Sequence, residues 1–267
     1  MRGTVFYVVM AAAVALVGVL ACDGDETTGS GEPDYWPNAD GNTWDYNTTD
    51  SEAGTYETSY RIAGARTVGG VECQEILIYR SDLPNESSSR FIVDNDEDLV
   101  YCYGEEFTVD SRVTKTKTFT ANTYRYPFTV GATWTVFDGA GVLPSNIPFV
   151  RVWSDDVDHD GIDDACDVSI QAEVVAREDV TVPAGTFAGS YRVRHTSNVV
   201  INLSSGGNAY IDTQTDNWVH PSVGIVKMHI ERAWRDGGLD GPDSWECTSD
   251  LLSYDVHLRG AENSRRL

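Results

Sequence analysis

The sequence predicts a mainly β protein, built as a curved antiparallel sheet or half-open β-barrel and preceded by an N-terminal signal helix. Two observations lead to this prediction. After residue 34 the apolar residues alternate with polar ones, or form short runs rich in Val, Ile, Tyr and Thr, as in β-strands. Gly, Pro, Asn and Asp separate these runs, and many short strands joined by turns are typical of antiparallel sandwiches and barrels.

The expected strands follow one another along most of the chain. Their ranges are 43–47, 56–63, 71–80, 90–94, 99–103, 113–120, 133–137, 168–177, 191–197, 199–203, 210–219, 224–233 and 251–258. Residues 64–70 and 204–208 are expected to form hairpin turns. About 245 residues would suffice for one large β domain or two small ones, and we expect a single domain over residues 34–267.

The N-terminus has the layout of an export signal. Arg2 gives a positively charged start, and an uncharged apolar run covers residues 5–20. The sequence Val-Leu-Ala-Cys that ends at Cys22 resembles the lipobox of bacterial lipoproteins. This resemblance implies that residues 1–21 are a signal peptide, and that Cys22 carries a diacylglyceryl group and an acyl chain such as palmitate. The alternatives are a plain secretory peptide and a membrane-spanning helix, although a span needs about 20 apolar residues.

Residues 22–33 are expected to form a lipidated flexible tether, because residues 23–33 are acidic, contain Gly and Ser, and lack apolar side chains. A tether of this length would hold the domain about 15–20 Å from the bilayer. We therefore expect a protein of the cell envelope that is attached to its membrane through lipid on Cys22. Asp23 resembles the inner-membrane retention signal of enteric bacteria. That rule does not extend to all bacteria, and we favour the outer membrane over the inner one.

Composition narrows the range of partners. The chain has 19 basic and 42 acidic residues, and its formal net charge is −23. Nucleic acid is not an expected partner, because phosphate binding needs clustered Lys and Arg. Seven Trp and thirteen Tyr indicate a packed core rather than an acidic disordered chain.

Four cysteines remain after lipidation of Cys22. In an oxidising compartment they favour two disulfides, with three possible connectivities. Neighbouring predicted strands favour Cys73–Cys102, and the second pair would then be Cys166–Cys247. The alternative is four free buried thiols.

One short pattern occurs twice. Residues 37–44 and 127–134 both read P-x-x-x-G-x-T-W, which is typical of a turn that leads into a strand and directs Trp to the core. Residues 35–46 and 126–134, which contain the two copies, resemble the TapB-like family of uncharacterised bacterial envelope lipoproteins, and so do residues 182–187 and 218–227. The resemblance implies a half-open barrel like that of the carriers LolA and LppX, which can hold acyl chains in the concave face. It implies no catalytic residues.

Residues 156–167 read D-x-D-x-D-G-x-x-D-x-C-D and predict a calcium loop, inserted at about residues 148–168. Calcium takes six to eight oxygen ligands, and loops of this type supply them from positions 1, 3, 5, 7, 9 and 12. The candidate metal ligands are Asp156, Asp158, Asp160, the Ile162 carbonyl, Asp164 and Asp167. Aspartate at position 12 with a cysteine just before it resembles a thrombospondin type 3 repeat. The alternative is a solvated acidic turn without an ion.

We expect no enzymatic activity and name no catalytic residue. The sequence lacks the G-x-S-x-G, H-E-x-x-H, P-loop and dinucleotide-binding motifs, and its five histidines lack metal-ligand spacing. The expected function is a structural or interaction module of the cell envelope that is stabilised by calcium and binds another envelope protein. The alternative is a periplasmic carrier or sensor of a hydrophobic or lipid ligand.

Overall fold

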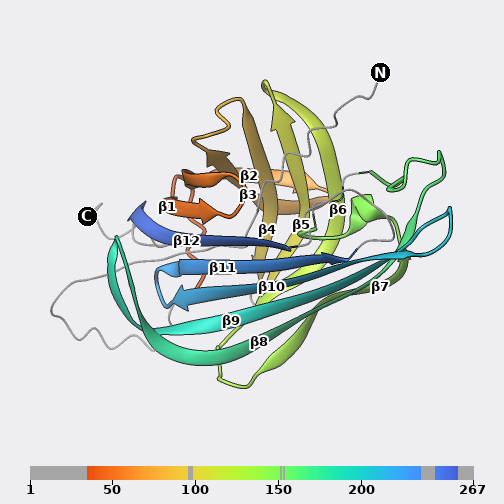
Figure 1. Ribbon diagram of the computed structural model, residues 1–267. Coiled ribbons are helices and arrows are strands. Elements are labelled where there is room, and N and C mark those ends of the chain that lie inside the picture. The colour runs from red at the N-terminus through yellow and green to blue at the C-terminus, as the bar shows by residue number, and fades with distance from the viewer. Residues whose placement is uncertain (1–34, 96–98, 151, 153, 236–243, 258–267) are drawn as a thin grey trace, which may run out of the picture.

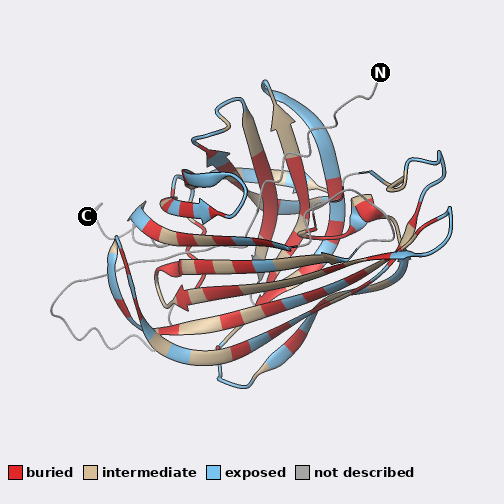
Figure 2. Ribbon diagram, viewed as in Figure 1, coloured by how far each residue is buried: buried red, intermediate tan, exposed pale blue. Residues whose placement is uncertain are grey.

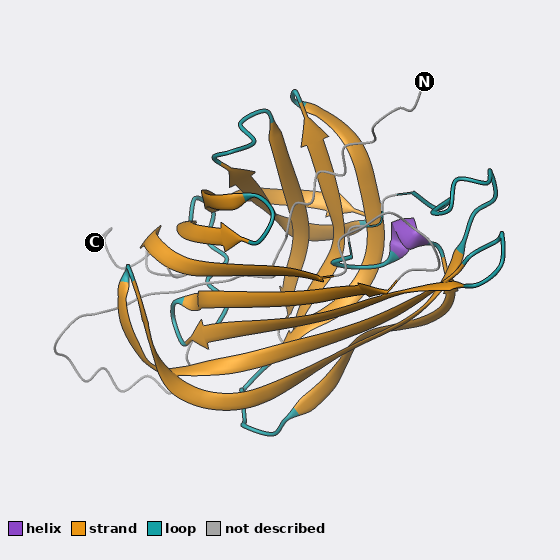
Figure 3. Ribbon diagram, viewed as in Figure 1, coloured by secondary structure: helices purple, strands orange, loops and turns teal. Residues whose placement is uncertain are grey.

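The computed structural model describes residues 35–95, 99–150, 152, 154–235 and 244–257, and it confirms the mainly β fold. The strands form one antiparallel sheet that curls into a nearly closed barrel (Figures 1 and 3). They are β1 (Thr43–Asp50), β2 (Gly54–Val68), β3 (Val71–Arg80), β4 (Glu86–Asn95), β5 (Leu99–Val109), β6 (Arg112–Arg125), β7 (Thr133–Val142), β8 (Ala165–Val182), β9 (Gly185–Asn202), β10 (Asn208–His220), β11 (Gly224–Arg235) and β12 (Ser244–Asp255), with the 3-10 turn η1 (Pro144–Asn146). The expected signal helix, Cys22 and the tether lie outside the described residues.

The chain is arranged as two meanders that meet in the middle of the sheet. The strand order is β6-β5-β4-β3-β2-β1-β12-β11-β10-β9-β8-β7, so each half pairs its strands consecutively and β1 joins β12. The repeated P-x-x-x-G-x-T-W pattern begins each half and makes the same contacts twice. Gly41 (φ +89°) donates to Ile62 O at 2.9 Å, and Gly131 (φ +88°) donates to Val174 O at 2.8 Å. The interpretation as a strand-entry turn is therefore confirmed.

Alternating burial along the strands packs the inside of the barrel (Figure 2). Inward-facing aromatic side chains such as Trp44, Tyr46 and Tyr124 have relative exposures of 0%, 1% and 1%. A void wide enough for an acyl chain would give its lining residues accessible surface. The middle of the barrel is thus filled by side chains.

Several strands are longer than the sequence pattern indicates. The expected strands at 191–197 and 199–203 are one continuous strand, β9. Asn198, which reads as a turn residue, pairs with Ser169 on β8 and with Asp212 on β10. Two flanking ladders hold this backbone extended and override the weak strand preference of asparagine.

Side chains close the seam between the edge strands β6 and β7. Trp134 Nε1 on β7 donates to Asn122 O on β6 at 3.1 Å. His195 Nε2 on β9 lies 3.0 Å from Thr123 O, also on β6. These contacts satisfy backbone carbonyls at the seam, where β6 and β7 do not pair as a ladder.

The buried imidazole of His195 makes this seam sensitive to acid. Burial lowers the pKa of His195 below its ordinary value of 6.5. The unfolded chain therefore takes up a proton below about pH 6.5 that the folded protein resists, so stability falls as the pH drops from there towards the lowered folded pKa. Between pH 6.5 and 5.0 we expect this residue to cost up to about 2 kcal/mol of unfolding free energy. Urea unfolding of the His195→Gln variant should show a smaller decrease in unfolding free energy between pH 6.5 and 5.0 than the wild type shows.

A matched control for that measurement is His257→Gln, because the His257 side chain is 70% exposed. It should keep the wild-type pH dependence. If His195→Gln loses as much unfolding free energy at low pH as the wild type, the proposed role of the seam histidine is contradicted.

The segment between β7 and β8 enters the barrel beside β6. Lys117, only 1% exposed, donates to the backbone oxygens of Pro144, Ile147 and Val150 at 3.3, 3.1 and 2.5 Å. Glu105 Oε2 accepts from Phe149 N at 3.3 Å, and its Oε1 accepts from Arg90 Nε at 2.9 Å. Buried charges thus hold a loop whose backbone has few partners of its own.

The barrel has two distinct ends. At the tether end, where the described chain begins, Tyr35 stacks on Tyr126 with ring centroids 5.0 Å apart. The tip of the β8–β9 hairpin also folds over this end, because Ala184 N donates to Leu251 O on β12 at 3.0 Å. The other end, called here the loop end, carries the acidic segment between η1 and β8 (Figure 1).

The two predicted disulfides are wrong: Cys73, Cys102, Cys166 and Cys247 are free buried thiols. Cys73 lies on β3 and Cys102 on β5, with β4 between them. Two strand spacings are about 9.6 Å, beyond the Cα separation of roughly 7 Å that a disulfide can span. The row of paired residues through Cys247 reaches β8 at Ala172 rather than at Cys166. Burial raises the pKa of Cys102, Cys166 and Cys247 to about 12, so these thiols stay neutral.

Candidate metal centre

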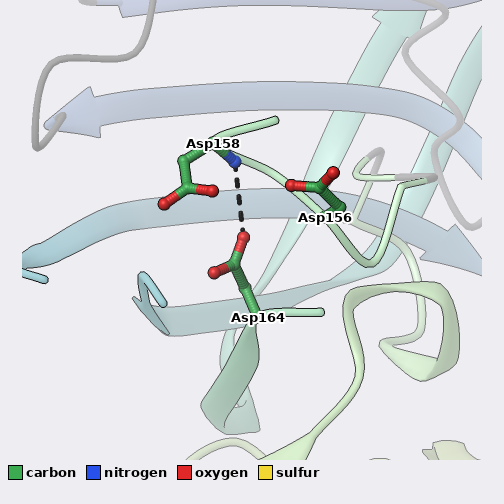
Figure 4. Close-up of side chains that lie close together, drawn as sticks. All are labelled: Asp156, Asp158 and Asp164. Carbon is green, nitrogen blue, oxygen red and sulfur yellow. Dashed lines mark hydrogen bonds between the residues drawn. The ribbon is translucent and has the colours of Figure 1, made fainter. Parts of the chain in front are cut away.

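Three of the predicted ligands come together at the loop end (Figure 4). One carboxylate oxygen from each of Asp156, Asp158 and Asp164 lies within 4.8 Å of the others. This limit equals twice the usual Ca–O distance of about 2.4 Å, so one ion could contact all three. The donors are all carboxylate oxygens, which is the chemistry that calcium prefers. The residues present therefore fit the predicted ion.

Asp164 is the innermost residue of this group and is fully buried. Its Oδ2 accepts from Val157 N at 2.6 Å and from Asp158 N at 3.3 Å. Its Oδ1 accepts from Ser204 N at 2.7 Å. Backbone donors thus fix the orientation of the Asp164 carboxylate. Asp164 directly precedes strand β8, which begins at Ala165.

The turn over residues 156–161 follows the pattern expected of a cation loop. Asp156 accepts from Asp160 N and Gly161 N, both at 3.1 Å. Gly161 has φ +92°, a left-handed conformation that favours glycine at position 6 of the motif. The chain therefore wraps around the Asp156 carboxylate without help from other elements.

The other predicted ligands are not part of this carboxylate group. Asp160 Oδ1 accepts from Ile162 N at 2.9 Å. The Ile162 carbonyl stays a predicted ligand, because the group is defined by side-chain oxygens alone. Asp167 lies on β8, where its carboxylate accepts from Gly141 N at 3.2 Å and from Asn202 Nδ2 at 3.3 Å. Position 12 is thus committed to contacts between strands, because β8 begins at Ala165 and carries Asp167 onto the exposed face.

Two contacts that hold the loop have no signal in the motif. Ser205, in the β9–β10 turn, donates to Asp158 Oδ2 from its hydroxyl and, at 3.2 Å, from its backbone N–H. The hydrogen bond from the Ser205 hydroxyl lowers the pKa of Asp158. Ser145 in η1 donates to both oxygens of Asp155, at 2.8 and 3.0 Å. A local pattern could not have found these serines, because they lie 47 and 10 residues from their partners.

Comparisons with known proteins add little to this geometry. No protein-family model matches the chain, and no curated protein matches it. The resemblances to the TapB-like family, to LolA and to thrombospondin type 3 repeats therefore stay predictions.

Two solved structures are similar to part of the fold. A predicted lipoprotein of Parabacteroides distasonis has a TM-score of 0.35 and 15% identity, with 84% of this chain and 99% of that chain covered. A predicted exported protein with a YmcC-like fold, from Bacteroides fragilis, has a TM-score of 0.33, 14% identity and the same coverages, 84% and 99%. Both scores are below 0.5, and neither similarity bears on the chemistry of this chain. Within the described residues, no helix is long and apolar enough to cross a membrane.

Proposed function

We propose that this protein is a non-enzymatic, lipid-anchored module of the cell envelope that uses a calcium-stabilised loop to contact another envelope protein. The observation that carries the proposal is the position of the acidic loop, at the opposite end of the barrel from Tyr35. A tether before residue 35 would direct the loop end away from the membrane surface. The loop would then be available to a partner.

The packed interior supports an interaction module over a carrier. A carrier of acyl chains needs a cavity of several hundred Å³. The inward-facing side chains of the central barrel, including Trp44, Val193 and Leu251, have no accessible surface. The outer and end surfaces are therefore the parts of the fold left for recognition.

Calcium would hold the loop by joining carboxylates that otherwise repel one another. Asp156, Asp158 and Asp164 would bind the ion, and Asp164 already joins the loop to the β9–β10 turn through Ser204. Neutralising this cluster would stabilise both loops together, because like charges at such distances cost free energy when no cation is present.

Removing calcium should lower the thermal stability of the full chain. Loops of this type bind calcium with dissociation constants of about 0.1–1 mM, so 10 mM calcium should add about 1.4–2.7 kcal/mol relative to a chelator. The melting temperature should therefore rise by roughly 3–10 °C, as measured by calorimetry in detergent with and without calcium. Asp158→Ala should abolish this rise.

Asp163→Ala is the matched control, because Asp163 is an exposed aspartate of the same loop that occupies no ligand position. It should keep the calcium response. The proposal fails if the wild-type melting temperature is the same with and without calcium, or if both variants lose the response equally.

A further inference from the structure

Arg232, on β11, faces the inside of the barrel near the loop end and has no carboxylate partner among the described residues. Its Nε donates to Thr213 Oγ1 at 3.4 Å, and its guanidinium carbon lies 5.2 Å from the centre of the Trp245 ring. Other inward-facing cations are satisfied: Arg90 pairs with Glu105, and Lys117 donates to three carbonyls. An inward-facing arginine without a carboxylate partner in the described ranges is unexpected in a chain with 42 acidic residues.

The surroundings of Arg232 disfavour the charged form of its guanidinium group. Burial lowers the pKa of Arg232, and the attraction of Glu52 does not offset that effect. Glu52 is exposed on the β1–β2 turn and forms no ion pair with Arg232. The arginine remains charged at neutral pH all the same, because guanidinium groups do not lose their proton in proteins.

Solvent reaches the inner face here. Most inward positions are buried, including Ile211 and Ile230 on the two strands concerned. Thr213, Thr215 and Arg232 are partly exposed in the same region. The inner wall is therefore accessible at this place, next to a guanidinium that has no carboxylate partner in the described part of the chain.

Two neighbouring side chains, Trp234 and Ser197, have polar atoms without a hydrogen-bond partner among the described residues. Trp234 faces inward two residues after Arg232, and its buried Nε1 has no hydrogen-bond partner among the described residues. Ser197 on β9 pairs in register with Thr213, which pairs with Arg232. The Ser197 hydroxyl is also buried, and no residue that the structure describes is its hydrogen-bond partner. An indole N–H can only donate, and a hydroxyl can donate. The guanidinium, the indole N–H and the hydroxyl thus lie on one inner wall, and the last two are buried donors without an acceptor among the described residues.

We propose that Arg232, Thr213, Ser197 and Trp234 form a binding site for a small soluble oxyanion, a phosphate or carboxylate group, on the inner wall of the loop end. The planar guanidinium matches two oxygens of such a group at once. Trp245 packs beside the guanidinium and limits its movement. A soluble anion is favoured over a lipid headgroup because Ile211, Ile230 and Trp245 beside the site are buried, so they offer no exposed apolar surface to an acyl chain.

Titration of the full chain with inorganic phosphate in low-chloride buffer tests this site, because Trp234 and Trp245 report on it by fluorescence and calorimetry gives the affinity. Saturable binding should weaken at least tenfold in Arg232→Gln and severalfold in Thr213→Val. Arg235→Gln is the matched control, since Arg235 is exposed on the same strand and pairs with Asp212. It should bind phosphate like the wild type.

Arg232→Lys is the second variant, in case Arg232→Gln fails to fold. The Arg232→Lys protein should bind phosphate with an affinity between those of the wild type and Arg232→Gln, because lysine keeps the charge and loses the two-point contact. The absence of saturable phosphate binding in the wild type would overturn the proposal, and so would wild-type affinity in a folded Arg232→Gln. A short-chain phosphatidylglycerol below its micelle concentration is titrated in parallel. Arg232-dependent binding of this lipid without any binding of phosphate would overturn the soluble-anion assignment in favour of a headgroup.

Discussion

Replacing Lys117 with methionine should lower the free energy of unfolding by about 3–5 kcal/mol, because buried carbonyls that lose their donor keep the cost of leaving water. The ammonium group binds the backbone oxygens of Pro144, Ile147 and Val150, and methionine has nearly the same length without a donor. Urea denaturation followed by tryptophan fluorescence measures the change. This effect should exceed that of removing calcium, since three buried acceptors are involved.

Lys115→Met is the matched control, because Lys115 lies two residues earlier on β6 with an exposed side chain. Its unfolding free energy should stay within about 0.5 kcal/mol of the wild type. Equal and small effects of the two substitutions would mean that the β7–β8 segment is not held by Lys117.

Arg90→Met should destabilise the protein by about 3–5 kcal/mol, because it leaves the Glu105 carboxylate buried without its cation. The pair is joined at 2.9 Å, and the two side chains are 4% and 9% exposed. The double variant Arg90→Met/Glu105→Leu should recover part of the loss and cost about 1–3 kcal/mol, since both charges are then removed and Phe149 N–H loses its acceptor. Chemical denaturation of the four proteins gives the double-mutant cycle.

Arg61→Met provides the matched control for that cycle, because Arg61 is exposed on β2. It should change stability by less than about 0.5 kcal/mol. If the double variant is less stable than both single variants, the buried pair does not act as a coupled unit.

The alternation of apolar residues predicted most of the strands, because one face of each strand packs inward and the side chains have a period of two. The P-x-x-x-G-x-T-W pattern predicted the turns before β1 and β7, since a glycine with positive φ and a buried Trp are local requirements. The boundaries of β9 were missed, because the ladders that keep Asn198 extended come from β8 and β10.

The acidic motif only partly predicted which carboxylates lie close together. Asp156 and Gly161 follow from the loop itself, as their contacts lie within a few residues. Asp158 is also held by Ser205, which lies 47 residues away. Asp167 had the right spacing, but strand β8 starts before it and carries it to Asn202. A motif cannot show where a neighbouring strand begins.

The sequence by itself determined the β class, the strand-entry turns and the core of the acidic loop, because each depends on residues close together in the chain. The tertiary structure decided the free state of the four thiols, the closing of the seam by His195 and the absence of a carboxylate beside Arg232 in the described part of the chain. These features depend on the register between strands that are distant in sequence. A shift of one residue in that register would turn each side chain to the other face of the sheet.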